Sequence, residues 1–218
     1  MFRNVFSKVT TLLSLGLLAA ISTVAHATTT VETFDLTQNG LGVTGQTFAV
    51  VTLTQSAIGT VTVQEVLSSG IDFVGKSSGD ALAFDIAGLT PAQLKSDITF
   101  APSSLGKYTV SSSSYATPFG SFLDAIDSSS SSPYAGPLNF TITDPGLTLS
   151  DFTPTISSYG NSFFASDIKD YSECGYPTGL VGGRLTWTTT VVPEPSSLLL
   201  LGTGILGLAG AVRRRLMV

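Results

Sequence analysis

The chain has 218 residues, and its 15 acidic and 10 basic residues give a formal charge of −5 at pH 7. Nucleic acids are bound by clustered lysine and arginine, so this balance argues against a nucleic-acid partner. The single histidine, His26, lies in an N-terminal segment that we expect to be removed, which excludes Ser-His-Asp catalysis and histidine-ligated metals in the mature chain. We accordingly expect no cofactor.

The first segment, residues 1–27, has the layout of a secretory signal peptide. It has a positive start, a short apolar middle and a small-x-small cleavage site, which are Arg3 with Lys8, Leu12–Val24, and Ala25-His26-Ala27, respectively. This layout predicts cleavage after Ala27 and makes the export machinery the first expected partner of the chain.

The middle of the chain, residues 28–191, is long enough for one domain with its own hydrophobic core. Its five basic and fourteen acidic residues leave a formal charge of −9, so this region is more acidic than the whole chain. An anionic membrane surface is therefore an unfavourable partner for the domain.

Alternating apolar and polar residues predict a series of short β-strands in this domain. The segments with this pattern are 47–54, 60–66, 81–86, 107–111, 120–126, 138–143, 162–166 and 184–191. Ser56–Gly59 separates the first two segments and predicts a hairpin. Thr90, followed by Pro91, predicts one short helical turn that runs to Lys95. Short strands separated by Gly, Pro, Asp or Ser predict an antiparallel β-sandwich or jelly roll.

Two groups of acidic residues are candidates for a site. Asp167, Asp170 and Glu173 are spaced three apart, and such oxygen ligands hold Ca²⁺ when a loop brings them together. The group lacks the alternating ligands and the mid-loop glycine of a calcium loop, so we favour a solvated acidic loop. We interpret Asp124 and Asp127 in the same way. Two carboxylates across a cleft would also suit glycoside hydrolysis, but the sequence singles out no pair.

Aromatic residues offer another kind of site, because aromatic rings suit the apolar faces of sugars. The candidates, several of which lie in predicted loops, are Tyr108, Tyr115, Tyr134, Tyr159, Tyr171, Tyr176 and Trp187. The alternative, which we favour for Trp187, is a place in the hydrophobic core together with Phe84, Phe122 and Phe140.

The C-terminal segment, residues 192–218, begins with Val192, and its Pro193 and Pro195 keep the chain extended. An almost unbroken apolar run follows from Ser196 to Val212. In a helix this run spans about 25 Å, at the short limit for a bilayer core of about 30 Å. It predicts one transmembrane helix. The arginines that follow it favour the cytoplasmic side and leave the middle domain outside; they are Arg213, Arg214 and Arg215.

The same segment resembles the PEP-CTERM sorting signal of Gram-negative bacteria. The resemblance rests on Val192-Pro193-Glu194-Pro195, Leu198–Leu201, the arginine cluster and four glycines, which are Gly202, Gly204, Gly207 and Gly210. It implies an exosortase-like membrane enzyme as partner, with cleavage near the Pro-Glu-Pro motif. It also implies a cell surface or an exopolysaccharide matrix as destination. An ordinary tail anchor that is never cut is the alternative.

Parts of the middle domain are similar to a recurrent ectodomain of PEP-CTERM proteins. The similar stretches are Leu82–Ile86, Phe119–Phe122, Phe164–Ile168 and Thr178–Gly182. This resemblance implies a single β domain and transfers no catalytic residue. Such relatives often hold cysteines in pairs, whereas Cys174 is the only cysteine here. A buried or idle thiol is favoured over a bond to another chain or to a ligand.

Together these features predict three parts: a signal peptide (1–27), a β ectodomain (28–191) and a sorting segment (192–218). We expect an exported protein that is anchored by its C-terminal helix until an exosortase-like enzyme processes it. Its expected role is structural or adhesive, in exopolysaccharide or biofilm, and it is a substrate of catalysis rather than an enzyme. A carbohydrate-binding module and, less favoured, a surface glycoside hydrolase remain as alternatives.

Overall fold

A computed structural model describes residues 28–39, 46–75, 79–116, 118–157, 160–171 and 178–191. These residues form a mainly β structure with short helices α2 (Pro91–Asp97) and η1 (Leu149–Asp151). The strands are β1 (Thr29–Asn39), β2 (Ala49–Ala57), β3 (Thr60–Leu67), β4 (Ile71–Phe73), β5 (Asp80–Phe84), β6 (Ile98–Phe100), β7 (Tyr108–Ala116), β8 (Ser121–Ser128), β9 (Leu138–Thr143), β10 (Thr155–Ser157), β11 (Gly160–Ser162), β12 (Phe164–Asp170) and β13 (Thr178–Val191).

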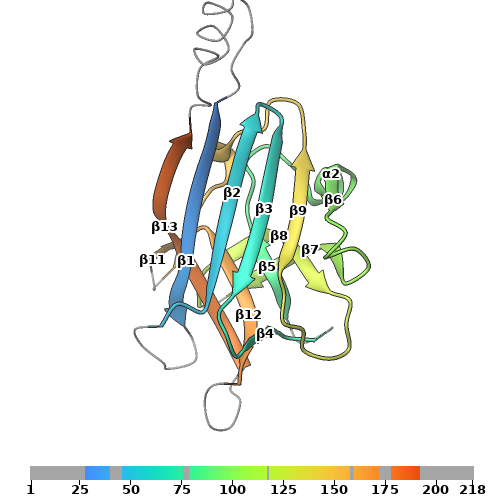
Figure 1. Ribbon diagram of the computed structural model, residues 1–218, viewed down its shortest axis with the longest axis vertical. Helices are drawn as coiled ribbons and strands as arrows, with labels where there is room; N and C mark the ends of the chain where they lie inside the picture. Colours follow the sequence, from blue (N-terminus) through green and yellow to red (C-terminus); the bar gives the residue numbers. More distant parts are fainter. Residues whose placement is uncertain are drawn as a thin grey trace, which may run out of the picture. The chain divides into compact units, whose positions relative to one another are not determined.

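Eleven of these strands form one continuous antiparallel sheet. Its order is β6-β9-β3-β2-β1-β13-β12-β5-β8-β7, and β4 joins by pairing with β12. Figure 1 shows β13, β1, β2, β3 and β9 in a front layer, with β12, β5 and β8 behind them. The sheet therefore folds over on itself, and its two halves face each other.

The long strand β13 connects the two halves of the sheet. It pairs with β1 from Thr29↔Val191 to Asn39↔Val181, and its first part also pairs with β12 from Phe164↔Gly183 to Lys169↔Thr178. A β-bulge interrupts the first pairing between Thr33 and Phe34. Such an extra residue bends the strand and increases its twist, which helps the sheet to turn from one layer to the other.

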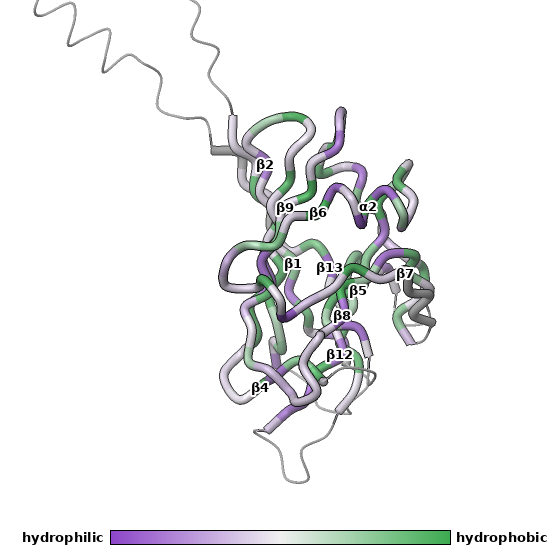
Figure 2. Tube along the Cα trace, turned by 90° about the vertical axis from the view of Figure 1, so that its right-hand side faces the viewer, coloured by the Kyte–Doolittle hydropathy of each residue, from purple (hydrophilic) through white to green (hydrophobic). Residues whose placement is uncertain are grey.

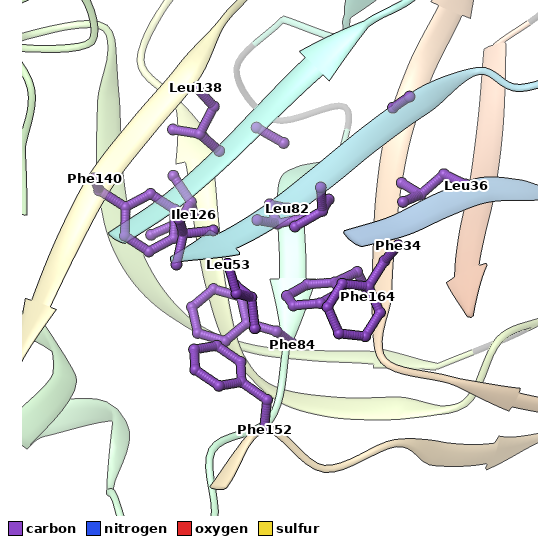
Figure 3. Packing of buried hydrophobic residues seen from close by; sticks show 14 of the residues in the cluster. Phe34, Leu36, Leu53, Leu82, Phe84, Ile126, Leu138, Phe140, Phe152 and Phe164 are labelled. Atoms are coloured by element: carbon purple, nitrogen blue, oxygen red, sulfur yellow. The ribbon is translucent and has the colours of Figure 1, made fainter. Parts of the chain in front are cut away.

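The main hydrophobic core lies between the two halves and is rich in phenylalanine. Figure 3 shows Phe34 of the front layer beside Phe164, with Phe84 and Phe152 in the same group of buried rings. The ring of Phe164 lies 4.8 Å from that of Phe34 and 6.3 Å from that of Phe84, centroid to centroid. Figure 2 shows hydrophobic and hydrophilic residues interspersed along the chain, and buried residues alternate with more exposed ones in β2, β3 and β9, as expected when one side of a strand faces such a core.

Local sequence signals account for the hairpin and for the helix. Ala57 pairs with Thr60, so Ile58 and Gly59 form the β2–β3 turn, where Gly59 has a φ of 87° that favours glycine. At α2 the hydroxyl of Thr90 accepts a hydrogen bond from the backbone N–H of Gln93, and the Gln93 side chain accepts one from the backbone N–H of Thr90. This capping box satisfies two backbone donors at the start of the helix.

The predicted antiparallel, mainly β architecture is confirmed, together with the hairpin and the helix. A sandwich or jelly roll implies two separate sheets, whereas here both layers belong to one sheet. The strand pattern did not predict β1 or the short strands β4, β6, β10 and β11. No helix among the described residues has the length and apolarity needed to span a membrane. The predicted transmembrane run lies outside these residues.

Candidate functional site

The residues predicted to carry sorting and processing lie outside the described part of the chain. They are Ala25, Ala27, Val192, Pro193, Glu194, Pro195, Arg213, Arg214 and Arg215. The structure describes the residues that connect to both processing segments, Thr28 on the N-terminal side and Val191 on the C-terminal side.

These two connection points lie at the same end of the β domain. Thr29 of β1 pairs directly with Val191 of β13, and opposed Cα atoms in such a pair are about 5 Å apart. The two ends of the described domain therefore lie side by side, and each directly adjoins one of the predicted processing segments in the sequence. Because Val191 is held in the ladder, the sorting motif begins where the folded domain ends.

The acidic residues of β8 do not form the solvated loop expected for them. Asp124 is 1% exposed and lies on a strand, so that prediction is wrong for this residue. The pKa of Asp124 is raised to about 6, chiefly by burial and also by the neighbouring Asp85 carboxylate, while a backbone hydrogen bond from Ile86 acts in the opposite direction. Asp127 lies on the same strand, opposite Asp80 of β5.

The calcium hypothesis finds no support in the geometry of β12. Asp167 and Asp170 are both buried on this strand, and residues three apart on a strand point to opposite faces. The expected solvated loop is therefore wrong for them as well, while Glu173 lies outside the described residues. Burial raises the pKa of Asp167 to about 6. In the part of the chain that is described, no cluster of three or more His, Cys, Asp or Glu residues could hold a metal ion.

A buried carboxyl that the sequence analysis missed lies in the main core. Glu65 of β3 is completely buried, and neither of its carboxyl oxygens has a hydrogen-bond partner of good geometry. Burial raises the pKa of Glu65 well above its usual value, and the Ser166 side chain offsets this only in part. The Ser166 hydroxyl donates to the carbonyl of Ala81 at 2.6 Å, so its proton is already engaged.

The described tyrosines do not gather on one exposed surface. Tyr108 is buried, and its ring packs against Phe73, Phe100 and Tyr134. Tyr171, in contrast, is exposed, and the Lys169 ammonium lies 4.9 Å from its ring centroid.

Other aromatic predictions have different outcomes. The three phenylalanines predicted for the core, Phe84, Phe122 and Phe140, are buried. The side chains of Tyr115 and Trp187 are not among those described, and Tyr159, Cys174 and Tyr176 lie outside the described residues.

The outer side of the front layer carries an array of threonines that the sequence analysis also missed. We call it the threonine face; its members are Val31, Thr33, Val50, Thr52, Thr54, Thr62, Gln64, Val66, Thr99, Asn139, Thr141 and Thr143. One row crosses five strands through the pairs Val31↔Thr54, Thr54↔Thr62, Thr62↔Thr141 and Thr141↔Thr99. Alternate threonines in each strand were a signal for it, but only the strand order places them side by side.

A comparison with protein families matches residues 191–215 to the PEP-CTERM protein-sorting motif. The chain thus carries a PEP-CTERM sorting signal directly after β13, as the sequence predicted. The motif implies export, a membrane-anchored tail before processing and an exosortase as the processing partner. No match to the chain was found among curated proteins or among solved structures.

Proposed function

We propose that this protein is a structural or adhesive component of the cell surface or of an exopolysaccharide matrix, delivered there by its C-terminal sorting signal. The observation that carries the proposal is the sorting motif at residues 191–215, which follows the last strand without a spacer. The predicted helix of residues 196–212 holds the motif at the outer surface of the membrane, where a membrane enzyme reaches it.

In this proposal the protein is a substrate of the sorting enzyme and not a catalyst. Perturbed carboxyl groups are a common mark of active sites, and Asp85 and Asp124 form such a neighbouring pair. Asp124 is buried at 1% exposure, however, so a glycan has no access to its carboxyl group. The raised pKa of this residue is better explained by burial in a domain with few basic residues.

Replacement of Pro193, Glu194 and Pro195 by alanine will abolish processing. The variant will remain in the membrane with its full mass, whereas the wild-type chain will yield a form shortened near the motif. Intact-mass spectrometry of protein from the membrane and from the medium measures this difference.

The matched control is the double variant Asp144→Ala/Pro145→Ala, which removes an acid–proline pair from the turn after β9. We expect this variant to be processed like the wild type. If the Pro-Glu-Pro variant still yields a shortened form of wild-type mass, the proposed sorting route is wrong.

A further inference from the structure

The twelve members of the threonine face are uncharged and regularly spaced, although the domain that carries them has a formal charge of −9. They are Thr, Val, Asn and Gln, and Asp35, which pairs with the member Val50, is an acid on the same side of the sheet. Figure 1 looks onto this side of the sheet, and no described element lies in front of it. The hydroxyls of Thr62 and Thr141 lie 3.3 Å apart across two strands.

The spacing of the array follows from the geometry of the sheet. Neighbouring strands are about 4.8 Å apart, and every second residue along a strand is about 6.7 Å from the last. Each threonine presents a methyl group and a hydroxyl that both donates and accepts hydrogen bonds. Threonine is stiff at χ1, so little side-chain entropy is lost when a ligand orders the face.

One edge of the threonine face is hollowed. Beside β1 there is a depression of about 510 Å³, lined by Val31, Thr33, Asp35, Thr186 and Thr189. The Thr186 hydroxyl donates to the carbonyl of Thr33 at 2.8 Å, at the place where the β1–β13 register shifts. The volume lies within the range of small-ligand sites.

The chemistry of the face selects one class of partner. The residues that contribute most of the binding energy in protein interfaces are mainly Trp, Tyr and Arg, and Thr and Val are under-represented among them. The listed members of the face include no Trp, Tyr or Arg. Anionic polymers and anionic lipids need clustered basic residues, whereas the listed members of the face include none, and the basic residue at its β13 edge, Arg184, is paired in the ladder with Asp35. A neutral polysaccharide can contact both groups of each threonine side chain. The apolar faces of its sugar rings pack against the methyl group, and the hydroxyls along the ring edges form hydrogen bonds with the threonine hydroxyl.

We infer that the threonine face binds a neutral polysaccharide, with the chain lying across β1, β2, β3, β9 and β6 and one sugar in the depression beside Thr33. Each contact is weak, but a polymer engages many of them at once, so their effects combine. The inference rests on the proposed function, because only an exported protein meets an extracellular polymer of this kind.

The test measures retention of the purified full-length chain on three polymers in a neutral detergent without a sugar headgroup. The polymers are cellulose and cross-linked dextran, which are uncharged, and alginate, which is anionic. We expect retention on at least one neutral polymer and none on alginate. The triple variant Thr54→Val/Thr62→Val/Thr141→Val, which keeps the shape and β-propensity of the face, will bind at least ten-fold more weakly. Thr109→Val, an exposed threonine on β7, is the matched control and will bind like the wild type.

Three results would overturn the inference. They are no retention on either neutral polymer, equal retention of the triple variant and the wild type, or alginate binding as strong as neutral binding. Sedimentation of the same samples tests whether a second copy of the chain covers the face instead. If the wild type forms a concentration-dependent dimer and the triple variant does not, the face is a dimer interface. Because binding is measured on the purified, unprocessed chain, its failure leaves the sorting result untouched.

Discussion

Acidification from pH 8 to pH 5 will stabilise the β domain, and Glu65→Gln will remove much of this pH dependence. Among the described residues, every carboxyl group whose pKa clearly departs from its ordinary value has a raised pKa. These groups are Glu32, Glu65, Asp72, Asp85, Asp124 and Asp167. Desolvation by burial is the largest cause in each case. A domain with five basic residues for fourteen acids has few cations that could lower these pKa values.

The direction of this pH dependence of stability follows from the number of protons that each state binds. Above pH 4 the unfolded chain loses the protons of these carboxyls, while the folded chain keeps them up to its higher pKa, which is about 6 for Asp124 and Asp167. The folded state then binds more protons, so the free energy of unfolding falls as the pH rises. For Glu65 the loss is about 1.4 kcal/mol per pH unit between its unfolded and folded pKa values.

Thermal unfolding of the wild type and of Glu65→Gln across this pH range provides the measurement. Around pH 8 the variant should have a higher Tm than the wild type, and this advantage should shrink as the pH falls and vanish near pH 4. Gln64→Glu places a carboxylate on the exposed side of the same strand and should change Tm little at any pH. A wild-type Tm that rises with pH, or a pH dependence unchanged in Glu65→Gln, would contradict the assignment.

Phe164→Ala will destabilise the domain by about 3–5 kcal/mol, because it leaves a cavity where the two halves of the sheet meet. The Phe164 ring is completely buried and contacts Phe34 from β1, Phe84 from β5 and Phe152 after η1. Its removal therefore weakens contacts to both layers at once. The midpoint of unfolding by urea, measured with the slope held constant, gives the change in free energy.

Two further variants serve as comparisons for Phe164→Ala. Leu123→Ala removes a large apolar side chain that is 62% exposed on β8 and should cost less than about 0.5 kcal/mol. Phe164→Leu keeps part of the ring volume and should lie between the other two. Equal effects of Phe164→Ala and Leu123→Ala would show that the halves do not meet at Phe164.

The elements that could be predicted from the sequence are those with local signals. Alternation located most of the longer strands, and Thr90 with Pro91 located the helix. Strand β1 was missed because its apolar residues do not share one face: Val31 belongs to the outer face, while Phe34 and Leu36 lie in the core. Folding of a single sheet into two layers depends on pairings between distant segments, which a period-2 pattern does not contain.

The buried acids show a different limit of the sequence analysis. Val61 and Val63 were placed on one face of their strand, and the same alternation places Glu65 on that face, so the signal was present. An acid in a strand is ordinarily expected at the surface, so Asp124 was expected in a solvated loop and no prediction was made for Glu65. The apolar side chains of a strand determine its register, and the alternation of side chains then places these carboxyl groups on the core side.

The pairing of β1 with β13 has a consequence for how the domain is made. Thr29 is the second residue after the predicted signal-peptide cleavage site, and its ladder partner Val191 is the last residue of the sheet. Contacts between such distant segments form late, because a long loop must be closed before they gain any stability. We therefore expect the exported polypeptide to stay unfolded while it crosses the membrane, and its last strand to complete the fold only after the whole domain has emerged.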